Sequence, residues 1–132
     1  MNGYTFLRKN HDRISRLAIS LKDMNTIRFQ GTEHFAHQLV KFMICHHLLR
    51  LKHHFKTEQL IKNSVCDIID LDTFIIYEIE SHVHPIVRRK KLEAFYHPLI
   101  TDIQIVDIKK LKHIKSVLPL RNEIGRYCGL SK

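Results

Sequence analysis

Residues 65–80 read VCDIIDLDTFIIYEIE, and this stretch decides the fold. Both of its halves are rich in β-branched and aromatic residues, which are typical of strands. The tetrapeptide Asp70-Leu71-Asp72-Thr73 predicts a tight turn between the halves, with Leu71 and Asp72 at its tip. The stretch therefore predicts a β-hairpin.

Helices and further strands flank this hairpin. Apolar residues at helical spacing predict a helix over residues 10–22 and a second, largely buried helix over residues 33–54 with Thr32 as its cap. The other expected elements are strands at 57–61, 65–70, 73–80 and 101–106, helices at 86–96 and 109–116, and a last helix from Pro119 to near Gly129. A hairpin followed by a strand–helix–strand crossover predicts an α/β fold with a mixed sheet flanked by helices.

Length and composition narrow the class of protein. The 132 residues predict a single domain over residues 1–132. No apolar stretch approaches the roughly 18 residues of a membrane span, and the N-terminus lacks a signal-peptide run. Three cysteines without a CxxC pair match neither a zinc ribbon nor a closed disulfide framework. We therefore expect a cytoplasmic protein that does not enter a membrane.

Charge is distributed unevenly along the chain, whose formal net charge is +9. Residues 56–80 hold six acids and two lysines, whereas residues 1–55 and 81–132 carry +6 and +7. Two basic flanks favour a polyanionic partner, with nucleic acid as the first choice. The alternative is that solvated lysines serve solubility.

Three carboxylates converge on the predicted hairpin. With the tip at Leu71 and Asp72, Asp67 pairs with Ile76 and therefore shares a face with Glu78 and Glu80. Oxygen ligands of this kind suit Mg²⁺ or Mn²⁺, which polarise phosphates and generate hydroxide from water. The alternative is that these acids pair with Lys or Arg at a solvated strand end.

The other face of the hairpin is apolar in this register and would pack on a helix. It holds Cys66, Ile68, Ile75, Tyr77 and Ile79. Because side chains alternate between faces, a turn longer by one residue would move Asp67 to this apolar face. The shared face of the acids therefore depends on the length of the turn.

The segment Cys66-Asp67-Ile68-Ile69, the turn, and Ile75-Ile76-Tyr77-Glu78-Ile79-Glu80 together resemble the core of the PD-(D/E)XK nuclease superfamily. That group includes restriction endonucleases and archaeal Holliday junction resolvases. The resemblance covers residues 33 to about 107 and extends to the family's order of helix, three strands, helix and strand. It implies a restriction endonuclease-like core, with the first helix and the C-terminal helical tail outside it.

The resemblance implies an endonuclease that hydrolyses phosphodiester bonds in DNA with Mg²⁺ or Mn²⁺. Asp67 falls at the aspartate of the motif and Glu78 at its second acidic position, and both would be catalytic metal ligands. Glu80 would complete the set, although the family usually has lysine there, so a second metal or a lysine from elsewhere would substitute. The extra glutamate of the first helix would be Glu33, with Glu58 as the alternative.

Basic residues and histidines surround this motif in the sequence. The run Arg88-Arg89-Lys90-Lys91 is expected to bind nucleic acid, but it covers all sides of a helix, so only one or two of its members would hold phosphates at the site. Among eleven histidines, His34 with His37 and His82 with His84 are spaced for joint binding, yet no zinc signature appears. We therefore expect surface or partly buried histidines.

Three functions remain open at the level of sequence. The first is the metal-dependent deoxyribonuclease, for which the resemblance also implies a homodimer because two sites cut two strands. The second is a non-catalytic nucleic-acid-binding protein that keeps the same fold, favoured by the missing lysine. The third is a protein-interaction domain whose basic surface is incidental.

Overall fold

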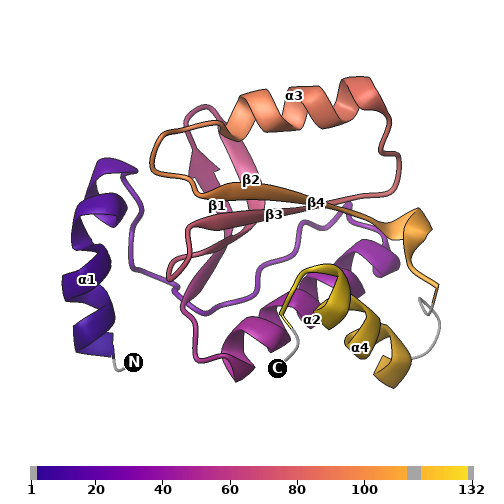
Figure 1. The fold of residues 1–132 in the computed structure, drawn as a ribbon, viewed down its shortest axis with the longest axis horizontal. Coiled ribbons are helices and arrows are strands. Elements are labelled where there is room, and N and C mark those ends of the chain that lie inside the picture. The colour runs from indigo at the N-terminus through magenta and orange to yellow at the C-terminus, as the bar shows by residue number, and fades with distance from the viewer. Residues whose placement is uncertain (1–2, 113–116, 131–132) are drawn as a thin grey trace.

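A four-stranded sheet forms the centre of the molecule (Figure 1). The computed structural model describes residues 3–112 and 117–130. The sheet has the order β1-β2-β3-β4, in which β1, β2 and β3 are antiparallel neighbours and β4 runs parallel to β3. The strands are β1 (Phe55–Ile61), β2 (Ser64–Asp70), β3 (Ile75–Glu80) and β4 (Asp102–Asp107). The predicted α/β class with a mixed sheet is confirmed.

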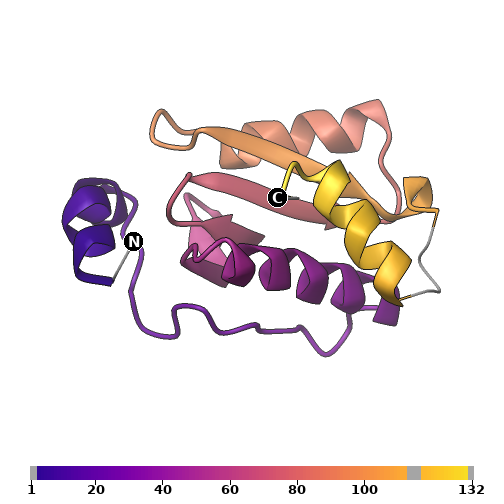
Figure 2. The same ribbon diagram turned by 60° about the horizontal axis from the view of Figure 1, so that its bottom comes forward.

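Helices cover both faces of this sheet. They are α1 (Gly3–Arg16), α2 (Phe35–Arg50), α3 (Pro85–Phe95) and α4 (Val117–Tyr127), with a 3-10 turn, η1 (Ile108–Lys110), after β4. Figures 1 and 2 show α2 and α4 side by side on one face, α3 on the other, and α1 beside the sheet. Within the described ranges, no helix has the length and apolar character that crossing a membrane requires.

The first two helices end earlier than predicted because the backbone turns left-handed after each. Ala18 has a φ of 54° and Ile19 donates its N–H to the Ile14 carbonyl, an arrangement that closes α1. Lys52, with a φ of 61°, has the same role after α2. The N-cap of α2 is His34 and not Thr32.

The predicted helix at residues 109–116 is represented only by η1, and residues 113–116 lie outside the described part of the chain. The predicted C-terminal helix is present as α4, although it begins two residues before Pro119. A proline within the first turn of a helix removes no helical hydrogen bond, so Pro119 is compatible with this earlier start.

The core lies in two layers, one on each face of the sheet. The layer under α2 and α4 includes Val40, Ile44, Leu48, Ile68, Tyr77, Val106, Leu120 and Ile124. The layer under α3 includes Cys66, Ile69, Phe74, Ile76 and Phe95, and Ile14 of α1 joins it. The expectation of a largely buried α2 is wrong for Phe35, Phe42 and Leu49, which are exposed because α4 covers only part of the outer side of α2.

The turn between β2 and β3 has four residues instead of the predicted two. The Asp70 carboxylate accepts the N–H of Asp72 at 2.8 Å and so holds this wider loop. The observed pairs are Ile68↔Tyr77 and Ile69↔Ile76, a shift of two residues from the predicted register. A shift by two leaves every β3 side chain on its predicted face.

Candidate metal centre

Asp67 and Glu78 meet at the point where β2 and β3 separate. The register of Ile68↔Tyr77, continued by one residue, sets Asp67 directly opposite Glu78. Each carboxylate then accepts a main-chain N–H of the other strand: Asp67 N donates to Glu78 Oε2 at 2.8 Å, and Ile79 N donates to Asp67 Oδ2 at 2.8 Å. The two side chains therefore replace the main-chain ladder and fill the gap between the strands.

The predicted closeness of Asp67 and Glu78 is present, but Asp67 also contacts a helix that the prediction did not include. The Asp67 carboxylate lies toward α2, with Oδ2 at 3.5 Å from His37 Nε2. Glu78 and Glu80 instead lie toward α3, where Lys91 Nζ is 3.2 Å from Glu78 Oε1 and 2.8 Å from Glu80 Oε1. The carboxyl groups of Asp67 and Glu78 remain in contact with each other, but their further contacts are to different helices, α2 for Asp67 and α3 for Glu78.

The backbone at Glu58 departs from regular strand geometry. Glu58 lies in β1 across from Asp67, between the pairs Thr57↔Ile68 and Gln59↔Cys66, and has a φ of 51°. A left-handed residue inside a strand interrupts the regular alternation of side chains. On the neighbouring strand β2, Cys66 packs in the layer under α3 and not with Ile68 on the face where the sequence pattern placed it.

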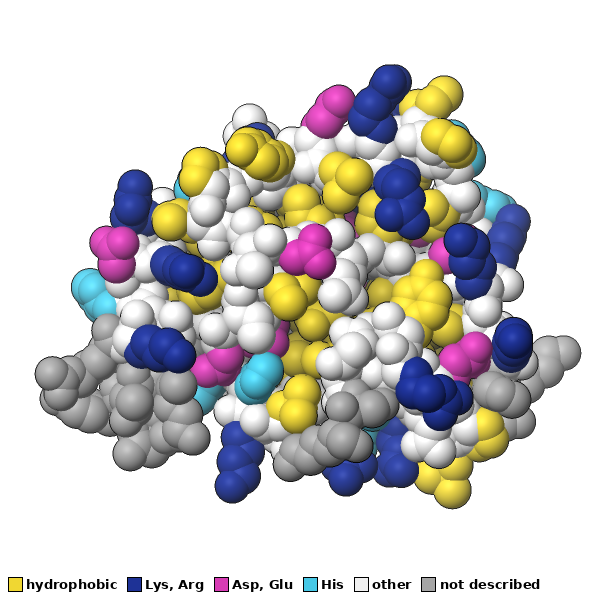
Figure 3. All heavy atoms as spheres, in the orientation of Figure 1, with side chains coloured by type: hydrophobic (Ala, Val, Ile, Leu, Met, Phe, Trp, Pro, Cys, Tyr) yellow, Lys and Arg dark blue, Asp and Glu magenta, His cyan; other side chains and the backbone are white. Residues whose placement is uncertain are grey.

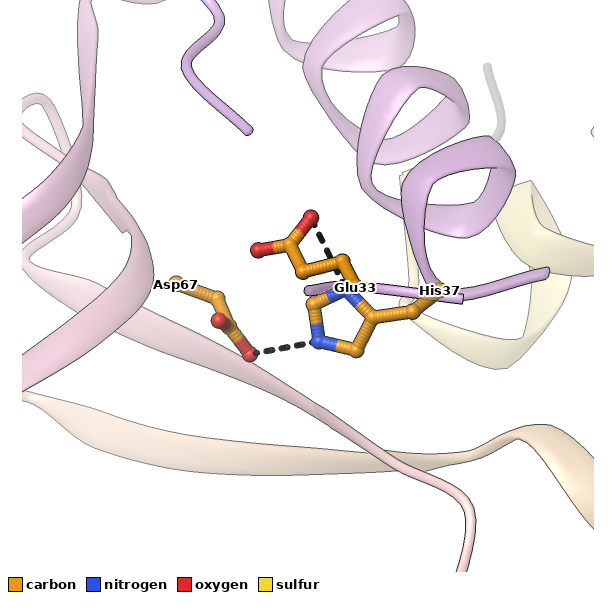
Figure 4. A group of neighbouring side chains, drawn as sticks. All are labelled: Glu33, His37 and Asp67. Atoms are coloured by element: carbon orange, nitrogen blue, oxygen red, sulfur yellow. Dashed lines mark ion pairs between the residues drawn. The ribbon is translucent and has the colours of Figure 1, made fainter. Parts of the chain in front are cut away.

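Glu33, His37 and Asp67 form a group with the donor atoms of a metal site (Figure 4). One donor atom from each lies within 4.8 Å of the others. Glu33 Oε2 is 3.4 Å from His37 Nδ1, the Glu33 side chain is 8% exposed, and neither of these two atoms has a hydrogen-bond partner. Since buried polar atoms are normally paired, this group has unused capacity for a ligand.

A buried lysine lies beside this group. Lys41 of α2 is fully buried, and its ammonium is 3.4 Å from Glu33 Oε1 and forms an ion pair with Glu58. Gln30 donates to the other oxygen of Glu58 at 2.8 Å. The left-handed turn at Glu58 therefore brings its carboxylate to Lys41, which neutralises part of the acid cluster from within.

Burial and neighbouring charges shift the proton affinities of this site. Burial and the adjacent Asp67 carboxylate raise the pKa of Glu78 to about 9, against the opposing charge of Lys91. Burial alone would raise the pKa of Asp67, but its bonds with His37, Glu78 and the Ile79 N–H outweigh burial and lower it. Asp67 in turn raises the pKa of His37. At neutral pH the acid pair therefore keeps one proton.

The basic run on α3 divides between two sides of the helix, as its consecutive spacing predicts. Arg88 and Arg89 line a hollow of about 340 Å³ that Lys110 also lines. Lys90 and Lys91 line another, beside β2. Only Lys91 of the four contacts the acid pair.

The sequence named Glu33 as a candidate ligand, and the structure brings it near Asp67, although it lies just before α2 and not within the helix; two other members of the site were missed. His37 was considered only together with His34 on the same helix, and not with Asp67, which lies 30 residues later on β2. Lys41 was given no role. The one sequence signal for Lys41 is a charge within the apolar run of α2, since a buried lysine requires a carboxylate partner.

A second group with metal-binding atoms contains His53, Asp70 and Asp72 at the end of β2. His53 Nδ1 lies 2.7 Å from Asp70 Oδ2, and the other oxygen of Asp70 accepts the N–H groups of Asp72 and Thr73. Asp72 accepts the N–H of His54. These contacts already satisfy the carboxylates, and we assign this group to the structure of the turn.

No protein-family model matches the chain, and comparisons with curated proteins and with solved structures also find no match.

Proposed function

We propose that this protein is a metal-dependent nuclease that hydrolyses phosphodiester bonds in DNA. The observation that carries the proposal is the adjacent pair of half-buried Asp67 and buried Glu78, which lies beside Glu33 and His37. Two adjacent buried carboxylates repel each other when both are ionised, and a bound divalent cation removes that cost. A proton occupies this role in the protein without metal.

The donor atoms fit a divalent cation. Glu33 and Asp67 offer carboxylate oxygens, and His37 offers an imidazole nitrogen within the same 4.8 Å. When bound, the ion would polarise a phosphate and lower the pKa of a coordinated water. Because imidazole suits transition metals better than Mg²⁺, this set favours Mn²⁺ over Mg²⁺.

The resembled motif usually has a lysine at the position of Glu80. In this proposal, Lys91 of α3 supplies that cation. Its ammonium contacts both Glu78 and Glu80, and its side chain is 32% exposed, which leaves it accessible to a phosphate oxygen. Lys41, in contrast, is fully buried and already paired with Glu33 and Glu58, so it holds the acids in place. The order α2-β1-β2-β3-α3-β4 also agrees with the order of the resembled family.

Exposed cations on α3 provide the proposed contact with DNA. Arg88, Arg89 and Lys90 are exposed on the helix that covers the Glu78 side of the sheet. Figure 3 shows Lys and Arg side chains around much of the outline of one face, with Asp and Glu between them. Binding through such scattered cations depends strongly on salt concentration.

A second candidate is a non-catalytic nucleic-acid-binding protein. One observation favours it: His37, Lys41 and Lys91 already pair with the acids of the site, which can therefore be satisfied without metal. The same assay distinguishes the two candidates, because a binder without catalysis retains DNA but leaves it intact.

The test is cleavage of supercoiled plasmid DNA with MnCl₂ or MgCl₂. We expect nicking by the wild type, inhibition by a chelator, and a loss of about 100-fold or more in Asp67→Asn because a metal ligand is removed. Asp12→Asn, in an exposed carboxylate of α1, is the matched control and should cleave as the wild type does.

Two outcomes oppose the nuclease. Salt-dependent binding by folded wild type, without cleavage of duplex, branched or single-stranded DNA, would select the non-catalytic protein. Cleavage that is retained in Asp67→Asn would place the chemistry elsewhere.

A further inference from the structure

A pocket of about 380 Å³ lies where the last turn of α2 meets α4, which Figure 2 shows side by side. His47, Arg50 and Leu51 line it from the α2 side, and Arg121, Asn122 and Arg126 from α4. His37 is 13 residues earlier on α2 than Arg50, which at the rise of an α-helix separates the two by about 20 Å. The pocket is therefore distinct from the candidate metal centre.

The charge of this pocket is uncompensated. No Asp or Glu lines it, and none of the ion pairs among residues 3–112 and 117–130 involves Arg50, Arg121 or Arg126. A cation in the last turn of a helix complements the helix dipole, which accounts for Arg50 and Arg126 one at a time. It does not account for three guanidinium groups around one hollow.

Two further contacts indicate that the pocket is prepared for an anion. Arg121 Nε is buried without a hydrogen-bond partner, and an unpaired buried donor is costly. His47, 7% exposed, donates from Nε2 to the Arg121 carbonyl at 2.8 Å and so ties α4 to α2. Burial makes the largest contribution to lowering the pKa of the neighbouring His46, and the charges of His47, Arg121 and Arg50 lower it further. The charges act in the direction expected of a positive local potential.

We propose that this pocket binds a phosphate group. Guanidinium groups match phosphate oxygens in bidentate geometry, and three of them from two helices surround the group from different sides. The volume lies in the range of small-ligand sites and exceeds what a single inorganic phosphate fills. The phosphate therefore belongs to a larger molecule, either a free phosphorylated compound or the backbone of a nucleic acid.

The test is a titration of the ¹⁵N-labelled full chain, followed by amide signals in NMR spectra with a chelator present so that no metal takes part. One arm uses inorganic pyrophosphate and the other a short single-stranded oligodeoxythymidine. We expect shifts at residues 47–51 and 121–126. In the double variant Arg50→Gln/Arg126→Gln we expect affinity to fall tenfold or more, since charged hydrogen bonds to phosphate are lost.

Arg50 and Arg126 are exposed, so their substitution leaves the core intact. The control is Lys9→Gln/Lys22→Gln, which removes the same charge from exposed positions elsewhere and should bind as the wild type does. Shifts in the pocket with pyrophosphate alone identify a free phosphorylated compound as the source, and shifts with the oligonucleotide identify a nucleic-acid backbone.

Three results overturn the proposal: no shift in either arm, unchanged affinity in the Arg50→Gln/Arg126→Gln variant, or an equal loss in the lysine control. Since no metal is present and no cleavage is measured, these results leave the proposed nuclease activity untouched.

Discussion

Half-buried Asp67 and buried Glu78 lie side by side between β2 and β3. Burial and the charge of Asp67 raise the pKa of Glu78 to about 9, so this carboxyl group keeps its proton at neutral pH. A divalent cation held by Glu33, His37 and Asp67 would add positive charge beside Glu78 and lower the pKa of that carboxyl group. Metal affinity should therefore increase with pH, and binding should release a proton.

Glu78→Gln tests this protonation. The carboxyl group has a pKa of 4.5 when unfolded and about 9 when folded, so the native wild type binds the extra proton and loses stability as pH rises between these values. The limiting slope is about 1.4 kcal/mol per pH unit. Glutamine cannot ionise. Without metal, the free energy of unfolding of the variant, measured with urea, should therefore increase relative to that of the wild type from pH 5 to pH 8.

Two results bear on that prediction. A difference in unfolding free energy that stays constant with pH would show that Glu78 is ionised in the folded protein. Glu93→Gln, in an exposed carboxylate of α3, controls for the loss of one negative charge.

Lys41→Met tests whether the buried lysine holds the acids in place. Methionine keeps the length of the side chain but leaves Glu33 and Glu58, with 8% and 14% exposure, facing each other without a cation. We expect the free energy of unfolding to fall by about 3–5 kcal/mol. Lys22→Met removes an exposed lysine and should change it little. Equal stability of the two variants would contradict the structural role of Lys41.

At the scale of elements, the strands, α3 and the mixed sheet followed from β-branched runs, alternation and Pro85. The register between β2 and β3 could not be predicted in this way. It depends on a four-residue loop held by hydrogen bonds to the Asp70 carboxylate, and such bonds leave no alternating pattern in the sequence. The left-handed backbone of Glu58 could not be predicted from the sequence either, since glutamate has no preference for that conformation. The observed register sets Asp67 directly opposite Glu78.

The packing of α4 on α2 is tested by Leu120→Ala. Leu120 is fully buried in the layer under α2, and the cavity left by its side chain should cost about 2–5 kcal/mol of unfolding free energy. Leu118→Ala, at a leucine that is 63% exposed on the same helix, should change it by less than about 0.5 kcal/mol. Urea unfolding of both variants measures the difference. Similar losses in the two would mean that α4 does not dock as described.

At the scale of the whole molecule, the charge pattern of the sequence has a structural meaning. The acidic stretch at residues 56–80 forms β1, β2 and β3, and its three glutamates pair with Lys41 of α2 and Lys91 of α3. The composition predicted a separation between acidic centre and basic flanks. It could not predict that the flanks supply the cations that pair with the centre, because those contacts join distant parts of the chain.

The most direct test of the candidate metal centre is a calorimetric titration with MnCl₂. We expect one Mn²⁺ per chain, bound more tightly than Mg²⁺, with proton release seen from the dependence of heat on the buffer. Asp67→Asn and His37→Ala should weaken binding by about tenfold or more, whereas His34→Ala, at an exposed histidine, should bind as the wild type does. Absence of Mn²⁺ binding by the folded protein, or equal binding by Asp67→Asn, would contradict the metal centre.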